Sequence, residues 1–168
     1  MTHTPESVKA WLRSYGELIA DIDNLCERAE ILREKASSPS SPIIDGMPHE
    51  KGGHTDRIGN LVSQCDLLER EAANKLQKSR VLYKNINTAI KQIKGSGWAY
   101  KKAVLQMRYL DLATWDEVLD MLFMKKPDFL DKEDSYRRRC YKIHKTALEE
   151  LAEILNQNTE RKLQNDET

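Results

Sequence analysis

The chain has 168 residues, 32% of them charged and only 7% aromatic, with 27 basic and 27 acidic side chains. Such a composition excludes one thick globular core and favours helices with narrow apolar seams. With no apolar signal core at its start and no apolar run near the ~18 residues that span a bilayer, the chain is expected to be a cytoplasmic protein without membrane contact.

The first predicted helix begins at Thr4-Pro5-Glu6. Thr4 suits the N-cap, Pro5 suits the first turn, where its missing N–H is harmless, and Glu6 suits the positive end of the helix dipole. Apolar residues then recur at alternating spacings of four and three, which is a heptad seam. The seam consists of Trp11, Tyr15, Leu18, Ile22, Leu25, Ala29 and Leu32. The prolines and serines of 37–42 end this helix.

A second long helix is predicted to begin at Thr55 or Asp56 and to carry an apolar seam from Ile58 to Ile93. Two helices joined by the loop 37–54 fold back most simply as an antiparallel helical hairpin, a coiled coil over residues 4–95. A seam does not identify its partner, so each could instead pair with another copy. Both a monomer and a coiled-coil homodimer therefore remain open.

The connecting loop holds the only side chains that suggest a metal, which are His49, Glu50, His54 and Asp56. Their spacing fits no common zinc site and no cysteine lies nearby, so we predict no metal and no cofactor. The three cysteines, Cys26, Cys65 and Cys140, are widely spaced and odd in number. We interpret them as reduced core thiols.

Gly95-Ser96-Gly97 ends the hairpin, and residues 96–155 are predicted to form a compact unit of three helices. The first runs from Trp98 to Leu110. Thr114 and Glu117 form a capping box for the second, which runs from Trp115 to Leu122. The third runs from about Asp134 to Ile154, and residues 156–168 are expected to be a polar, fraying tail. The insertion 123–133 is longer than a usual turn and is expected to be a surface loop.

The third helix of this unit has one apolar and one basic face. Tyr136, Cys140, Ile143, Ala147 and Leu151 form one stripe, and between Ser135 and Leu148 there is no acidic residue. A packed helix with cations on its outer face, third in a group of three helices, is typical of a DNA-binding helix-turn-helix. The residues predicted to bind double-stranded DNA are Arg137, Arg138, Arg139, Tyr141, Lys142 and Lys145.

A second basic stretch, from Ala72 to Leu110, holds nine Lys or Arg residues and no acid. Its lysines could follow the DNA backbone beside the third helix, or they could face the acidic first helix. We favour mutual neutralisation. The lysines concerned are Lys75, Lys78, Lys91 and Lys94, and the acids are Asp21, Asp23, Glu27, Glu30 and Glu34.

Two segments of the chain resemble known families. The run AVLQMRYLDLATWDEVLDML followed by YRRRCYKIHKTALEEL resembles the fourth conserved region of bacterial sigma-70 factors, a helix-turn-helix that reads a promoter element and touches RNA polymerase. The run SPIIDGMPHEKGGHTDRIGNLV followed by LLERE resembles a Gram-positive prophage regulator family of the RinA and ArpU types. This second resemblance covers roughly Leu12 to Leu155. It implies a phage or prophage transcriptional regulator that acts at promoters through or beside RNA polymerase.

The sequence offers no catalytic constellation, and we predict that the chain is not an enzyme. His144 lies beside Ile143 on the third helix, where a packed or phosphate-contacting histidine is expected rather than a general base. The predicted fold is therefore all-α, a helical hairpin followed by a helix-turn-helix, and the predicted function is DNA-binding transcription regulation. The alternatives are a non-enzymatic coiled-coil interaction protein and a DNA-packaging accessory.

Overall fold

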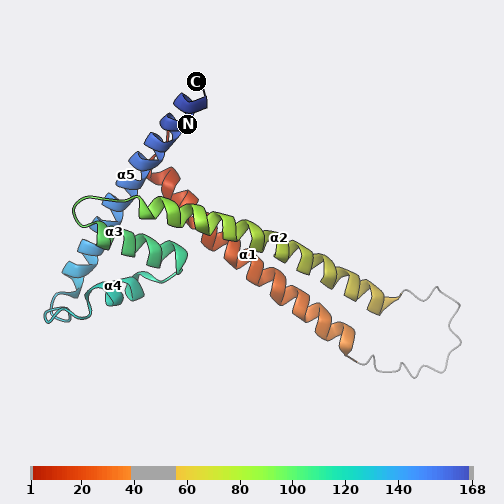
Figure 1. Cartoon of the computed structure of the whole chain (residues 1–168). Helices are drawn as coiled ribbons and strands as arrows, with labels where there is room; N and C mark the ends of the chain where they lie inside the picture. Colours follow the sequence, from red (N-terminus) through yellow and green to blue (C-terminus); the bar gives the residue numbers. More distant parts are fainter. Residues whose placement is uncertain (1, 39–55, 167–168) are drawn as a thin grey trace, which may run out of the picture. The chain divides into compact units, whose positions relative to one another are not determined.

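The computed structural model describes residues 2–38 and 56–166, and within these ranges the protein is all-α, as predicted (Figure 1). The long helices are α1 (Pro5–Ser37), α2 (Arg57–Lys91) and α5 (Glu133–Asp166). Two shorter helices lie between α2 and α5, namely α3 (Trp98–Leu105) and α4 (Trp115–Phe123), and α3 continues into a π-helical segment, η1 (Gln106–Leu110).

The predicted helix starts are confirmed where the structure describes them. Thr4 Oγ1 accepts a hydrogen bond from Ser7 N at 3.2 Å, and Asp56 Oδ1 accepts one from Gly59 N at 2.8 Å. Both side chains therefore satisfy amide groups that the first turn of a helix leaves without an intrahelical partner. Thr55, like most of the predicted loop 37–54, lies outside the described residues.

The chain divides into two compact units, and the division differs from the predicted boundary at residues 95/96. The larger unit combines Met1–Leu18 with Ser79–Thr168, whereas Ile19–Lys78 form a second unit, here called the arm. This division places both ends of the predicted hairpin domain, residues 4–95, in the larger unit. The start of α1 and the end of α2 contribute apolar side chains to the core of the larger unit. Periodicity along α1 and α2 does not reveal that these side chains pack against the helices that follow.

In the arm, α1 and α2 pair as antiparallel helices within one chain. Asp21 Oδ2 of α1 forms an ion pair with Lys75 Nζ of α2 at 2.9 Å, and further along α1 Arg33 forms an ion pair with Glu69 of α2. Later residues of α1 thus meet earlier residues of α2. The buried seam of the arm consists of Ile22, Leu25, Ala29, Cys65 and Ala72. These side chains cover one another within one chain.

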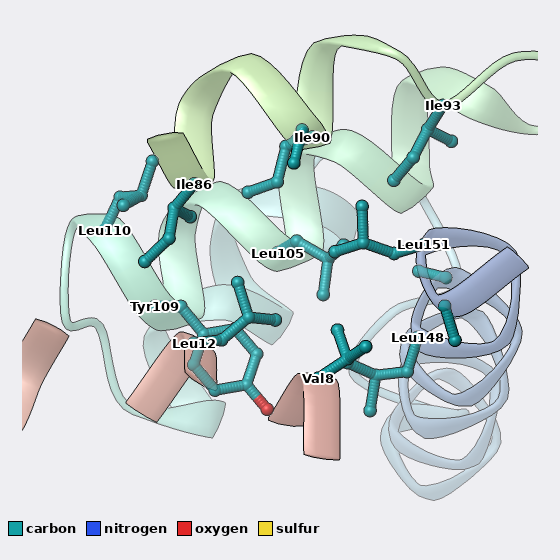
Figure 2. Packing of buried hydrophobic residues seen from close by; sticks show 13 residues of the cluster. Val8, Leu12, Ile86, Ile90, Ile93, Leu105, Tyr109, Leu110, Leu148 and Leu151 are labelled. Carbon is teal, nitrogen blue, oxygen red and sulfur yellow. The ribbon is translucent and has the colours of Figure 1, made fainter. Parts of the chain in front are cut away.

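The first core of the larger unit joins four segments of the chain: the start of α1, the end of α2, α3 with η1, and α5 (Figure 2). Its members from α1 are Val8 and Leu12, which are 1% and 0% exposed. The predicted seam residues Trp11 and Tyr15 are only partly buried at its edge. The remaining members are Ile86, Ala89, Ile90, Ile93, Leu105, Tyr109, Leu110, Ala147, Leu148, Leu151 and Ala152.

A second core lies among α3, α4, the segment after α4, and the first half of α5. It consists of Val104, Ala113, Val118, Leu119, Phe123, Phe129 and Cys140, with Tyr100, Met107, Trp115, Leu122, Tyr136 and Ile143 packed against it. This core fixes the outer face of α5, because α5 contributes its apolar side chains to it and leaves the opposite side chains to solvent.

The predicted helix over 98–110 is α3 and η1 rather than one uniform α-helix. Asp111 N donates to Gln106 O at 3.0 Å, five residues back, which widens the last turn. Leu112 follows with a φ of 57°, in the left-handed region that non-glycine residues seldom adopt. Its side chain lies against Gly16 of α1, where an added Cβ would stand 2.9 Å from Leu112 Cδ2. Gly16 therefore makes room for the chain reversal before α4.

Helix α5 continues to Asp166, so the predicted fraying tail over 156–168 is wrong for residues 156–166. Asn156 explains part of this difference. Its Oδ1 accepts from His3 N at 2.6 Å and its Nδ2 donates to His3 O at 3.0 Å, while Asn158 Nδ2 donates to Gln92 Oε1 at 2.9 Å. These polar side chains bind α5 to the start of the chain and to the end of α2.

Candidate nucleic-acid interface

The apolar stripe of α5 is buried as predicted. Cys140, Ala147 and Leu151 are at most 2% exposed, and Tyr136 and Ile143 are half-buried against the second core. Since successive residues turn by about 100° around a helix, this burial directs Arg138, Lys142 and Lys145 away from the protein.

The six predicted DNA-binding residues do not share one environment. Arg138, Arg139, Tyr141, Lys142 and Lys145 are exposed, whereas Arg137 is half-buried. Arg137 Nη1 donates to Asp116 Oδ1 of α4 at 2.6 Å, and its Nη2 donates to Glu133 Oε1 at 2.8 Å. These two carboxylates raise the pKa of Arg137, Asp116 having the larger effect. Arg137 thus links α5 to α4, and its charge is locally balanced.

Four cations in the first half of α5 face solvent: Arg138, Arg139, Lys142 and Lys145, here called the cationic face. Within residues 2–38 and 56–166, no carboxylate forms an ion pair with the first three. Lys145 Nζ is 4.0 Å from Glu149 Oε1, and its side chain is 79% exposed. An exposed pair of that length contributes little binding energy. The cationic face therefore carries a local excess of positive charge on a neutral chain.

Aromatic side chains support both edges of this face. The guanidinium of Arg139 lies 5.8 Å from the centre of the Phe123 ring. On the other edge, Tyr141 meets Trp115 edge to face, with ring centres 5.0 Å apart. The guanidinium of Arg108 lies 5.5 Å from the centre of the Trp115 ring. Tyr141 remains 43% exposed, so its ring is held by α4 while part of it faces solvent.

Arg139 and Lys142 also line a groove of about 380 Å³ between α5 and the start of α3. The opposite wall is formed by Ser96, Gly97 and Lys101. Lys101 Nζ donates to Glu150 Oε2 at 2.7 Å, which neutralises Lys101 and fixes the spacing of the two helices. This groove could not be predicted from the sequence, since its walls lie about forty positions apart in the chain.

The insertion 123–133 is folded onto the second core rather than being only a surface loop. Phe129 is 6% exposed, and Asp128 accepts hydrogen bonds from Tyr136 Oη at 2.7 Å and from Lys132 Nζ at 3.0 Å. These two donors lower the pKa of Asp128, Tyr136 having the larger effect. The segment thereby anchors the first turns of α5. Lys125 and Lys126 remain exposed.

The predicted capping box of α4 is present. Thr114 Oγ1 accepts from Glu117 N at 3.3 Å, and Glu117 Oε2 accepts from Thr114 N at 2.7 Å. The backbone hydrogen bond from Thr114 lowers the pKa of Glu117. The box fixes the point at which the chain enters α4 and so places Asp116 within reach of Arg137.

His144 is a packed histidine, one of the two environments predicted for it. It is 7% exposed, shares a hydrogen bond of 2.9 Å between its Nε2 and Tyr109 Oη, and meets the Trp115 ring edge to face. Burial lowers its pKa to about 4, and the nearby cations Lys9, Arg108 and Arg13 act in the same direction. The folded larger unit therefore holds His144 neutral at neutral pH.

We expect acid to destabilise the protein through His144. Between its unfolded pKa of about 6.5 and its folded pKa of about 4, only the unfolded state takes up the proton, so the stabilising effect is complete above the first value and is lost as the pH falls toward the second. At about 1.4 kcal/mol per pH unit, the free energy of unfolding should fall by up to roughly 3 kcal/mol. Urea unfolding at pH 7 and at pH 4 measures this loss.

His144→Gln is the matched variant, because an amide can still bond to Tyr109 but does not titrate. Its loss of stability between the two pH values should be smaller than that of the unmodified chain by the contribution of His144. Parallel stability curves for the two proteins would contradict the assignment.

The predicted metal-ligand candidates lie only partly within the described residues. His49, Glu50 and His54 lie outside the described residues, where the predicted absence of a metal stays untested, and Asp56 caps α2. Among residues 2–38 and 56–166, no group of three or more His, Cys, Asp or Glu side chains could hold a metal ion.

Cys65 and Cys140 are buried, as predicted for core thiols, whereas Cys26 is exposed. None of the helices in these ranges is both long and apolar enough to cross a bilayer.

Comparison of the chain with models of protein families, with curated proteins and with solved structures gives no match. The resemblances to sigma-70 region 4 and to prophage regulators therefore stay predictions, and the case for a function depends on the geometry of α5 and its neighbours.

Proposed function

We propose that the protein is a DNA-binding regulator of phage or prophage transcription, acting in the cytoplasm, and that α5 contacts the major groove of duplex DNA. The observation that carries the proposal is the cationic face, in which Arg138, Arg139 and Lys142 project from a helix held on its other side by a buried core. Positive side chains without carboxylate partners attract phosphates, and a helix of this diameter fits the major groove.

The residues of the cationic face suit two kinds of DNA contact, one to phosphates and one to base edges. Lys145 and Arg139 stand at its edges and suit phosphate contacts, which position a protein without reading sequence. Arg138 and Lys142 lie at the centre, opposite Cys140, and suit contacts to base edges, where Arg or Lys pairs best with guanine. Arg137 is better suited to holding α5 against α4, because Asp116 and Glu133 already occupy its guanidinium.

The proposed function predicts salt-sensitive binding that depends on Arg138 and Lys142. The four cations of the cationic face can neutralise at most four phosphates, which corresponds to a slope of up to about −4 for log affinity against log salt concentration. Arg138→Ala or Lys142→Ala should weaken a preferred site by ~1 to 3 kcal/mol and affect random DNA less. Fluorescence anisotropy can measure both, on a site selected from a random duplex pool and on a scrambled duplex.

Arg161→Ala is the control, since it removes one exposed cation from the same helix at a distance of about 28 Å from Lys142. It should leave both affinities unchanged. Failure of the unmodified chain to bind any duplex at low salt would refute the proposed function. Equal losses on preferred and scrambled DNA would reassign Arg138 and Lys142 to phosphate contacts.

A protein partner is the second candidate, and one observation favours it. Met121, Met124 and Leu130 are 69%, 65% and 89% exposed around the end of α4. Exposed apolar side chains beside a DNA-binding helix suit a contact with RNA polymerase, and they equally suit the rival function of an interaction protein. A gel shift on phage promoter fragments separates the two functions. A regulator shifts the DNA by itself, and added polymerase retards the complex further. An interaction protein leaves the DNA unshifted.

A further inference from the structure

A second basic surface lies where the chain turns from α2 into α3, over residues 91–102, here called the α2–α3 corner. Gly95 and Gly97 have φ values of 89° and 70°, and these left-handed residues reverse the chain. The reversal places Lys94 and Lys102 in the lining of one shallow pocket with Trp98. Lys102 Nζ stands 4.7 Å from the centre of the Trp98 ring and donates to Lys91 O at 2.8 Å.

The corner carries charge that no described carboxylate neutralises. The side chains of Lys91 and Lys94 are exposed, and neither forms an ion pair with any carboxylate in the described part of the chain. The neutralisation predicted for the lysines of this stretch is therefore confirmed for Lys75, which pairs with Asp21. It is not confirmed for Lys78, Lys91 and Lys94, which form no ion pair with a described carboxylate. Among the described residues nothing neutralises Lys91 and Lys94, so their charge is available to an anionic ligand.

The acid of α5 that contacts the corner, Glu150, is already occupied. Glu150 Oε1 accepts from the backbone N–H of Lys94 at 3.0 Å, and its Oε2 accepts from Lys101 Nζ at 2.7 Å. This carboxylate thus balances Lys101 and attaches the corner to α5, and the ammonium groups of Lys91 and Lys94 remain free of it.

The corner is continuous with the cationic face of α5. The groove between them has Ser96 and Gly97 on the wall formed by the corner, and Arg139 and Lys142 on the wall formed by α5. The two surfaces therefore border one groove. Arg139 and Lys142 lie on the wall formed by α5, and the exposed Lys94 lies two positions before Ser96 on the other side. A ligand that touches both surfaces must carry negative charge on both sides of this groove.

We propose that the α2–α3 corner is a second DNA contact, which holds the phosphodiester backbone beside the groove that α5 enters. This inference rests on the proposed function of α5. Duplex DNA fits because it presents a regular row of phosphates next to each major groove. Lysine ammonium groups act as point charges and make no paired contact with a base edge, so the corner adds affinity without adding sequence discrimination.

The test is the salt dependence of DNA binding by the full chain with Lys91→Gln and Lys94→Gln combined. Neither substitution removes a hydrogen bond, because the corner uses only the backbone of these residues. Loss of two phosphate contacts should reduce the steepness of the log-log salt plot by about 2. Between 50 and 200 mM salt, the variant should lose roughly tenfold less affinity than the unmodified chain. The ratio of preferred to scrambled affinity should stay the same.

The matched control removes two exposed cations elsewhere, by Arg28→Gln and Arg161→Gln. Its salt slope should equal that of the unmodified chain. An unchanged slope for the corner variant, or an equal change in the control, would overturn the inference while leaving DNA binding by α5 intact. Absence of binding by the unmodified chain at low salt would instead refute the proposed function itself, so the two failures can be distinguished.

Discussion

A chain that begins at Ser96 is expected not to fold, although it holds all three helices predicted for a helix-turn-helix. It lacks Val8, Leu12, Ile86, Ala89, Ile90 and Ile93, six of the thirteen residues of the first core. Burial of the five larger aliphatic side chains contributes roughly 10 kcal/mol, which is comparable with the whole stability of a typical domain. Far-ultraviolet circular dichroism should show little helix and no cooperative melting.

The complementary variant replaces the arm, Ile19–Lys78, by a short turn that joins Leu18 to Ser79. Both junction residues belong to the larger unit, and antiparallel helices are commonly joined by 2–8 residues. This chain keeps every member of both cores, so it should be helical and melt cooperatively. If the chain from Ser96 folded and the arm deletion did not, the division of the chain into these two units would be wrong.

Phe123→Ala is expected to destabilise the larger unit by ~3 to 5 kcal/mol, the usual loss for a buried phenylalanine. Phe123 is 1% exposed at the end of α4. Its ring stacks on Tyr100 with centres 6.0 Å apart and meets Tyr136 at 5.0 Å. The substitution therefore leaves a cavity where α3, α4 and α5 meet. Urea unfolding followed by fluorescence or circular dichroism measures the change.

Leu130→Ala serves as the control for Phe123→Ala, because Leu130 is 89% exposed in the segment that follows α4. Truncation of such a surface side chain should change the free energy of unfolding by no more than about 0.5 kcal/mol. Similar losses for the two variants would show that the second core is not packed around Phe123. The folded Phe123 variant should also bind DNA less tightly than the unmodified chain, since Arg139 loses the ring that supports it.

The starts of three helices could be predicted from the sequence because their caps are local. Thr4, Asp56 and Thr114 each bond to an amide only three residues ahead, so short spacing carries the whole signal. The partners of the helices could not be predicted in the same way. A heptad through Trp11 and Tyr15 shows that one side of α1 is apolar, but the deepest positions are Val8 and Leu12, on which side chains from α2, η1 and α5 converge.

In the candidate interface, too, the features of a single helix could be predicted, whereas the contacts between helices could not. The direction of Arg138 and Lys142 followed from their angular offset from Cys140, which is a property of the helix itself. The pairing of Arg137 with Asp116 depends on how α4 packs against α5, twenty-one positions away, and no pattern in the basic run indicates it. For Lys91 and Lys94 of the α2–α3 corner, the sequence left DNA contact and neutralisation open, and neutralisation was favoured. A charge count along the chain treats Lys75, which pairs with Asp21, like these two lysines, which pair with no described carboxylate.

The division of the larger unit between the two ends of the chain has a consequence for the order of folding. Val8 and Leu12 meet Leu148 and Leu151 only after a loop of more than a hundred residues has closed, and such a closure is entropically costly. The arm needs far shorter loops, since Ala29 meets Cys65 across thirty-six positions. A hairpin that forms early brings Leu18 next to Ser79 and thereby shortens the remaining closure. The arm would then act as an internal folding nucleus for the unit that carries the cationic face.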